Sequence, residues 1–287
     1  MSMDRLRDCA KGWLAAGTPA VVVQVSGALG SVPREVGTRM LVSADATAGT
    51  IGGGHLELKA IERARRMLAA GSDAAQSAHY PLGPALGQCC GGAVTLGFGL
   101  LDAAAFAMWP EPAPRFHLQL YGAGHVGRAI VQALAPLPVT VDWIDEREEE
   151  FPPAPSPPKV RRICVDAVEA EVETAPPGAF YLVLTHRHDL DLRISLAILE
   201  RGDFGFFGLI GSKTKRARFI HRFEERGIDA ATIARLTCPI GLPGLTGKEP
   251  EVIAAGVVAQ LLLASSDAAD QEPARRCSAA RSSTLTV

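Results

Sequence analysis

The sequence predicts two α/β domains: an N-terminal α+β domain, followed by a domain with a doubly wound parallel sheet. β-branched runs separated by glycine-rich turns occupy roughly the first hundred residues. From residue 116 onward, strand patterns alternate with helical patterns, as they do in parallel sheets. Between the two parts, the proline-rich segment MWPEPAPR has no periodicity and is typical of a linker. We therefore expect domains at residues 1–107 and 116–265, a linker at 108–115 and a disordered polar tail at 266–287.

The composition fits a globular protein and excludes several classes. Hydrophobic residues make up 47% of the 287 residues and charged residues 21%. The 29 basic and 31 acidic side chains give a net charge of −2, so we expect no nucleic-acid partner. The sequence contains neither a signal-peptide pattern nor an apolar run of about 18 residues, so we expect a cytoplasmic protein that does not contact a membrane.

In the N-terminal half, apolar runs at residues 20–26, 40–43 and 92–101 predict strands. A glycine-rich turn, GTIGGG, leads into a helix that can end at Gly71. The apolar positions at helical spacing in that helix are Leu58, Ile61, Ala64 and Leu68.

In the C-terminal half, the predicted strands lie in FHLQLY, VTVDWID, YLVLTH and FGFFGLIG. The predicted helices begin in HVGRAIVQAL, DLRISLAILERG, SKTKRARFIHRFEERG and EVIAAGVVAQLLLA. Repeated strand–helix units of this kind predict a Rossmann-like parallel sheet.

A dinucleotide fingerprint follows the first of these strands. Gly122, Gly124 and Gly127 form G-x-G-x-x-G, in which the glycines allow a tight turn, close ligand approach and close helix packing. Asp145 ends the next strand, where an acidic residue can bind a ribose. Arg147 could instead favour a 2′-phosphate, so the choice between NAD and NADP stays open. The alternative is a Rossmann domain that uses its crevice for another ligand.

Polar side chains follow the strand YLVL in the motif THRHDLD. His186, His188, Asp189 and Asp191 are therefore expected to face the crevice at the carboxyl end of the sheet. A metal site on His186, His188 and Asp191 is the alternative, and we favour a ligand-facing polar cluster. The remaining possibility is that His186 bonds the backbone and His188 is solvated.

Three further turns have the composition of anion sites. The turn GSKTKR leads from a strand into a helix and contains Gly211, Ser212, Lys213, Lys215 and Arg216. Lys248 precedes the last helix. In the N-terminal half, Gly53, Gly54 and His55 precede a helix, and Arg34 lies in a nearby turn. Phosphate or pterin binding and ordinary tight turns explain the N-terminal glycines equally well.

The segment GQCCGG places two adjacent cysteines, Cys89 and Cys90, after Gln88. A structural disulfide is disfavoured in a reducing compartment. A metal site, a thiol that handles a sulfur-loving ligand, and small buried residues remain.

These motifs together resemble the XdhC/CoxI family. GSVPREVGTRMLVS, GTIGGGHLE and GQCCGG are similar to its N-terminal domain. YGAGHVGRA, LTHRHDLDL, GLIGSKTKRARF and CPIGLPGLTGKEPEVIAAGVVAQLL are similar to its C-terminal Rossmann domain, and the resemblance covers about residues 5–264. GGGHLE and the short, single-copy architecture resemble the xanthine dehydrogenase accessory members.

This resemblance implies a chaperone that binds molybdenum cofactor (molybdopterin), holds it during sulfuration and inserts it into apo-xanthine dehydrogenase. It implies a cysteine desulfurase as second partner, and we expect a homodimer. Cys89 and Cys90 would be the molybdenum contacts, with no catalytic residue. The cofactor-binding residues would be Arg34, Gly53, Gly54, His55, Gln88, Cys89, Cys90, Gly122, Gly124, His125, Gly127, Asp145, His186, His188, Ser212, Lys213 and Lys248.

Two alternatives belong to other classes. The first is an NAD(P)-dependent oxidoreductase, with a dinucleotide or nucleotide in the Rossmann crevice. The second is a nucleotidyl-handling enzyme, with a divalent metal on His188 and Asp191.

Overall fold

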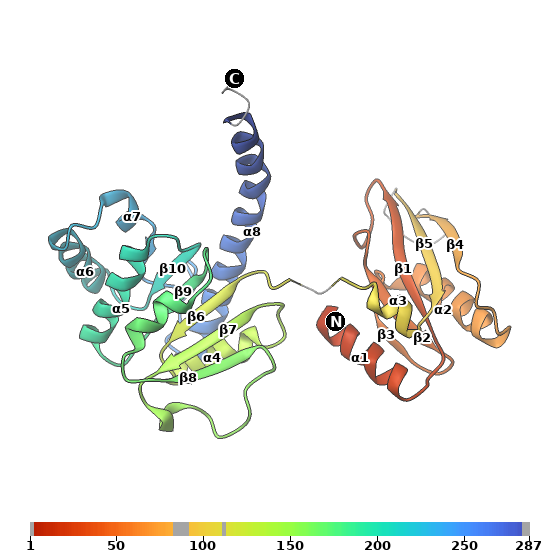
Figure 1. The fold of residues 1–287 in the computed structure, drawn as a ribbon, viewed down its shortest axis with the longest axis horizontal. Helices are drawn as coiled ribbons and strands as arrows, with labels where there is room; N and C mark the ends of the chain where they lie inside the picture. The colour runs from red at the N-terminus through yellow and green to blue at the C-terminus, as the bar shows by residue number, and fades with distance from the viewer. Residues whose placement is uncertain (1–2, 83–91, 111–112, 283–287) are drawn as a thin grey trace. The chain divides into compact units, whose positions relative to one another are not determined.

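The structure is a computed structural model that describes residues 3–82, 92–110 and 113–282, with side chains described through residue 266. The chain forms two compact units, Met1–Ala113 and Pro114–Val287. Each unit contains one sheet with its helices (Figure 1). The first sheet is antiparallel and the second is parallel, which confirms the predicted fold class.

The N-terminal sheet has five strands in the order β3-β2-β1-β5-β4. The strands are β1 (Ala20–Leu29), β2 (Arg39–Ser43), β3 (Thr47–Gly49), β4 (Gln76–Pro81) and β5 (Ala93–Leu100). Central β1 pairs with both β2 and β5, and all pairings are antiparallel. The three predicted strands are therefore present, and the two edge strands, β3 and β4, are additional.

Helices cover both faces of this sheet. Helix α2 (Gly54–Ala69) packs on the face that carries Val21 and Val23. Helix α1 (Met3–Ala15) packs on the opposite face with Val22, and short α3 (Ala103–Ala107) follows β5. Because successive residues of a strand point to opposite faces, β1 must be apolar at nearly every position.

The buried face of α2 differs from the predicted one. Leu56, Ala60, Ala64 and Met67 are buried, whereas Leu58 is 50% exposed. Alanines at two of the four buried positions allow the helix to approach the sheet closely. The apolar spacing that begins at Leu58 follows the flank of the helix instead.

The C-terminal sheet has six parallel strands in the order β11-β10-β9-β6-β7-β8. The strands are β6 (His117–Tyr121), β7 (Thr140–Asp145), β8 (Val160–Cys164), β9 (Phe180–Val183), β10 (Phe206–Leu209) and β11 (Leu236–Thr237). In chain order this is the Rossmann arrangement 3-2-1-4-5-6. The strand order reverses between β6 and β9, and ligands of such sheets bind at the carboxyl ends of these two strands.

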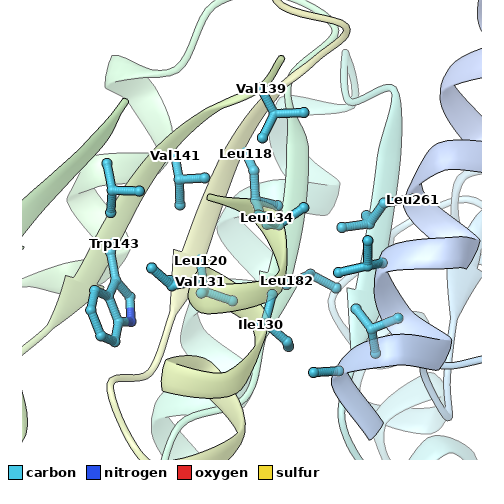
Figure 2. Close-up of a cluster of buried hydrophobic side chains, with 14 of the residues drawn as sticks. Leu118, Leu120, Ile130, Val131, Leu134, Val139, Val141, Trp143, Leu182 and Leu261 are labelled. Carbon is cyan, nitrogen blue, oxygen red and sulfur yellow. The ribbon is translucent and has the colours of Figure 1, made fainter. Parts of the chain in front are cut away.

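Helices cover both faces of the parallel sheet. α4 (His125–Leu134) and α8 (Pro250–Ser282) pack on one face, where Ile130, Val131 and Leu261 contact the sheet residues Leu118 and Leu120 (Figure 2). The other face packs against η3 (Val168–Thr174), α5 (His188–Arg201) and α6 (Lys213–Glu225). The remaining helical turns are η2 (Glu148–Glu150) and α7 (Ala230–Ala234).

Helix α8 continues through Ser282, although the sequence predicts an aperiodic tail from residue 266. Alanine is frequent in this stretch and has the highest helix propensity, so a helix can form without an apolar stripe. In the part of the chain that the structure describes, no helix is both long and apolar enough to span a membrane.

A buried carboxylate at the amino-terminal edge of the parallel sheet links stability to pH. Asp142 accepts hydrogen bonds of 2.9 and 2.8 Å from Arg161, and His117 Nε2 lies 3.2 Å from its Oδ2. Burial opposes ionisation, but the hydrogen bonds from His117 and Arg161 outweigh it and lower the pKa of Asp142 to about 2. Since a lowered pKa favours the folded state only above the unfolded value of 3.8, this contribution is lost as the pH falls from about 4 to about 2.

We expect Asp142→Asn to remove about 2 kcal/mol at neutral pH and to flatten the acid limb of the stability curve. Urea unfolding between pH 7 and pH 2 measures both effects. The exposed Asp166, replaced in Asp166→Asn, is the matched control and should leave the acid limb unchanged. An Asp142→Asn protein with wild-type stability at every pH would show that this carboxylate contributes nothing.

Candidate functional site

The glycine turn after β6 brings backbone segments into close contact. Gly122 has a φ of +123°, and a Cβ there would lie 2.4 Å from the carbonyl oxygen of Leu184. A Cβ on Gly127 would lie 2.1 Å from the carbonyl oxygen of Gly122. Gly124 is different, because no atom lies within 4 Å of the position its Cβ would take. The first and third glycines therefore fix the turn, and the second leaves open space above it.

The helix that follows this turn begins without a side-chain cap. Gly124 is the N-cap of α4, and no side chain accepts a hydrogen bond from the first turn there. His125, the first helical residue, is exposed. The free backbone N–H groups and the positive end of the helix dipole favour an anion at this position.

Asp145 lies at the predicted place, at the end of β7, but hydrogen bonds within the protein occupy its carboxylate. Its carboxylate accepts four hydrogen bonds: from the backbone N–H of Ala123 at 2.7 Å, and from the backbone N–H, Nε and Nη2 of Arg147 at 3.0 Å each. A carboxylate offers about four acceptor positions. Burial opposes ionisation, but the bonds from Arg147 and Ala123 outweigh it and hold the pKa of Asp145 below its usual range. No acceptor position remains for a ribose hydroxyl.

Arg147 is engaged by the same pairing. Besides Asp145, its guanidinium donates to Oε1 of Glu150 at 3.1 Å. A 2′-phosphate would have to displace two carboxylates to reach it. Asp145 and Arg147, the two residues that suggest dinucleotide recognition, therefore bind each other and stabilise the turns after β6 and β7.

The THRHDLD motif divides into an exposed part and a buried part. His186 and His188 are exposed, and His186 Nε2 lies 3.6 Å from Oε1 of Glu146. Asp191 is only 1% exposed and accepts hydrogen bonds from the backbone N–H and Oγ1 of Thr185 at 3.0 and 2.7 Å. The proposed metal ligands His188 and Asp191 thus differ in accessibility.

The partner of Asp191 is Lys215, a cation of the GSKTKR turn that the sequence suggested as an anion site. Lys215 Nζ lies 2.5 Å from Asp191 Oδ2 and donates to the carbonyl oxygen of Ile210 at 2.8 Å. Lys213, the predicted candidate, is exposed, and the hydroxyl of Ser212 caps α6 by accepting from the backbone N–H of Lys215. Gly211 leaves room for the Lys215 side chain, because a Cβ there would lie 2.6 Å from Lys215 Cδ.

A cavity of about 510 Å³ lies between α5 and α6. It brings His188 and Ser212 together with Lys215 and Arg218. Lys248 lies elsewhere, exposed on the loop that precedes α8. Among the described residues, no group of three or more His, Cys, Asp or Glu side chains is arranged to hold a metal ion.

In the N-terminal unit, the glycine turn before α2 is occupied by a side chain of its own helix. Glu57 Oε2 accepts from the hydroxyl of Thr50 at 2.5 Å and from the backbone N–H groups of Ile51 and Gly53 at 3.1 and 3.0 Å. These amides therefore already bind a carboxylate. Exposed Gly54 and His55 open the helix beside it.

Three of the sequence motifs lie together at one end of the antiparallel sheet, beyond the carboxyl end of β1 and the start of β5. A Cβ on Gly92 would lie 2.5 Å from the carbonyl oxygen of Leu29 and 2.3 Å from that of Ser31. A Cβ on Gly52 would lie 2.6 Å from Pro33. The turn that carries Arg34 thus packs against both the glycine motif and the residue that ends GQCCGG.

Gln88, Cys89 and Cys90 lie outside the described residues. Residues 83–91 connect β4 to β5, and the backbone N–H of Leu82 donates to the carbonyl oxygen of Gly92 at 2.8 Å.

Taken together, the fold and the crevice define a Rossmann-domain protein whose glycine turn favours an anionic ligand, joined to an antiparallel α+β unit. Two family models match the chain: the XdhC and CoxI family over residues 13–80 and the XdhC Rossmann domain over residues 118–261. The chain belongs to the XdhC and CoxI family, which confirms the resemblance of its motifs.

Two individual proteins are similar to this chain. The uncharacterized protein YqeB of Escherichia coli (strain K12) is 32% identical over 260 residues, which cover 85% of this chain and 43% of that protein. The chain therefore spans less than half the length of this relative. A crystal structure described as a xanthine dehydrogenase from Bacillus halodurans matches with a TM-score of 0.73 and 20% identity, over 92% of this chain and 96% of that one. This second likeness shows the shared fold.

Proposed function

We propose that this protein is a maturation factor for xanthine dehydrogenase that binds molybdenum cofactor and delivers it to the apo-enzyme. Family membership supports the maturation role. The observation that carries the choice of ligand is the engagement of Asp145, whose four hydrogen bonds leave no acceptor for a nucleotide ribose. The Rossmann turn nevertheless keeps an uncapped helix that favours an anion.

The residues of this chain fit the chemistry of such a cofactor. Molybdenum cofactor combines a phosphate with a pterin dithiolene that holds the metal. Within the C-terminal unit alone, the uncapped start of α4, beside His125, suits an anionic group such as a phosphate. Cys89 and Cys90 are soft thiol ligands that suit molybdenum or the transfer of sulfur. Arg34 lies in the turn that packs against Gly92. Gly92 follows Cys90 by two positions in the sequence.

An NAD(P)-dependent oxidoreductase is the second candidate, favoured by the G-x-G-x-x-G turn and the Rossmann strand order. To bind the ribose or its 2′-phosphate, such an enzyme would have to break the present hydrogen bonds of Asp145 or Arg147. Titration with NADH and NADPH, followed by nicotinamide fluorescence, separates the two candidates. Binding of either dinucleotide that Asp145→Ala weakens would favour the oxidoreductase.

The thiol contribution is tested by uptake of released molybdenum cofactor under anaerobic conditions. We expect the double variant Cys89→Ser/Cys90→Ser to bind the cofactor at least about tenfold more weakly, since loss of a soft ligand removes more than 1.4 kcal/mol. The control is Cys164→Ser, which removes an exposed free thiol at the end of β8 and should leave uptake unchanged. Equal uptake by the double variant and the wild type would refute the thiol role.

Partners follow from the same proposal. We expect apo-xanthine dehydrogenase and a cysteine desulfurase to bind the cofactor-loaded protein, and we expect a homodimer. Light scattering at several protein concentrations measures the homodimer. Co-elution of each partner with the loaded and cofactor-free protein measures the other two associations.

A further inference from the structure

A groove of about 360 Å³ lies on the face of the antiparallel sheet that α1 covers in part. Its floor is formed by β1 and β5, and its wall by the segment around α3 and Trp109. The residues that matter below are Gln24, Arg39, Gly97, Gly99 and Trp109. Of these residues, Arg39 belongs to the motif GSVPREVGTRMLVS, and the other four lie outside the motifs discussed above. Its volume lies at the lower end of the range for small-molecule sites, roughly 300–1,000 Å³.

The floor of the groove is flat because two of its residues lack side chains. Gly99 pairs with Val22, and Gly97 pairs with Gln24, so all four belong to the same face of the sheet. No atom lies within 4 Å of the place where a Cβ of Gly99 would be, and the nearest atom to a Cβ of Gly97 is 3.9 Å away. Neither glycine has a positive φ, so the backbone conformation of β5 does not require glycine at these positions. Their effect is to expose peptide planes on which a flat ring can lie.

The wall of the groove holds a cation that lacks a carboxylate partner. Arg39 Nε donates to Gln24 Oε1 at 3.0 Å, and its Cζ lies 5.2 Å from the ring centroid of Trp109. Within the described residues, no carboxylate pairs with Arg39. Burial, followed by the nearby positive charge of Arg7, holds the pKa of the Arg39 guanidinium below its usual range. A half-buried guanidinium ordinarily has a counter-ion, so this arrangement favours a negatively charged ligand.

The hydrogen-bonding groups point to the same kind of ligand. Because Gln24 Oε1 accepts from Arg39, the amide nitrogen of Gln24 is left as a donor. The terminal nitrogens of Arg39 add a planar pair of charged donors, which match a carboxylate or a conjugated oxygen–nitrogen edge. The face of the Trp109 ring already holds the guanidinium in place.

We propose that this groove binds a flat, anionic nitrogen heterocycle of the purine or pterin type. The ring lies over Gly97 and Gly99, and its acidic edge accepts hydrogen bonds from Arg39 and Gln24. This site is independent of the proposed cofactor role, which depends on Cys89, Cys90 and the start of α4. It adds a small-molecule binding site to the N-terminal unit.

The test uses the full chain and three probes in isothermal titration: urate, pterin-6-carboxylate and benzoate. We expect one of the two bicyclic anions to bind with a Kd below about 100 μM, and benzoate to bind at least about tenfold more weakly. The tighter of the two probes identifies the ring class. Absence of binding by both bicyclic anions at 1 mM, or benzoate binding as tightly, overturns the proposal.

Two variants locate the bound probe. Gly99→Val adds a side chain to the floor, where no atom lies within 4 Å of the Cβ position, and valine suits a strand. The variant should keep the wild-type Tm and abolish binding. Arg39→Gln should raise the Kd at least about tenfold, because it removes charged hydrogen bonds. The control is Arg65→Gln on helix α2, where Arg65 Nε donates to the carbonyl oxygen of Ser43 and neither residue lines the groove. Unchanged binding in folded Gly99→Val, or an equal loss in Arg65→Gln, overturns the assignment.

Discussion

Gly127→Ala is expected to destabilise the Rossmann unit by about 3 kcal/mol, the upper part of the usual range for overpacking. The added Cβ would lie 2.1 Å from the carbonyl oxygen of Gly122, which is backbone and cannot rotate away. Gly122 in turn packs against the carbonyl oxygen of Leu184, so the turn has no direction in which to relax. Thermal unfolding should show a Tm lowered by roughly 6–12 °C.

The control for this prediction is the central glycine of the same motif. Gly124→Ser meets no atom within 4 Å, and serine is a preferred N-cap, so stability should be equal or slightly higher. The new hydroxyl would accept from the first turn of α4 and compete with an anion for it. Gly124→Ser should therefore weaken cofactor binding in a protein that remains folded. Equal Tm values for Gly127→Ala and Gly124→Ser would contradict the roles assigned to these glycines.

Asp191→Ala is expected to cost 3–5 kcal/mol, on the order of what is lost when one partner of a buried ion pair is removed. Lys215 is 9% exposed, and its Nζ would lie beside an empty space, with only the carbonyl oxygen of Ile210 to bind. Thr185 would also lose the acceptor of its backbone N–H and hydroxyl. Urea unfolding of the purified variant measures the loss.

A second substitution separates charge burial from lost packing. Lys215→Met removes the unpaired ammonium and keeps a side chain of similar length, so Asp191→Ala/Lys215→Met should recover at least about half of the lost stability. If Asp191 served mainly as a metal ligand, Asp191→Ala would leave the apo-protein nearly as stable as the wild type. That result would contradict the structural role of the pair.

The strands that the sequence did not predict are all edge strands. β3 and β4 end the antiparallel sheet, and β8 and β11 end the parallel one. An edge strand has a neighbouring strand on one side only and is therefore less buried. It lacks the apolar run that marks central strands such as β1 and β9. The charged sequence of β8, VRRIC, is an example. Hydrophobic pattern therefore predicts the interior of each sheet and not its borders.

In the candidate site, the sequence predicts where a residue lies but not whether its side chain is free to bind a ligand. The position of Asp145 at the end of β7 follows from the spacing of the motif. Its engagement depends on Arg147 folding back on it and on the N–H of Ala123, and spacing alone carries neither contact. Likewise, only the rotation of α6 decides that Lys215 is buried while Lys213 is exposed.

The most direct test of the proposed function is the identity of the ligand that the wild-type protein carries. Protein purified without air from a molybdenum-competent host would be analysed for molybdenum content, for the fluorescence of oxidised pterin and for nicotinamide by mass spectrometry. We predict molybdenum and pterin in equal amounts, and their loss in Cys89→Ser/Cys90→Ser but not in Cys164→Ser. Nicotinamide dinucleotide in place of pterin would contradict the proposal.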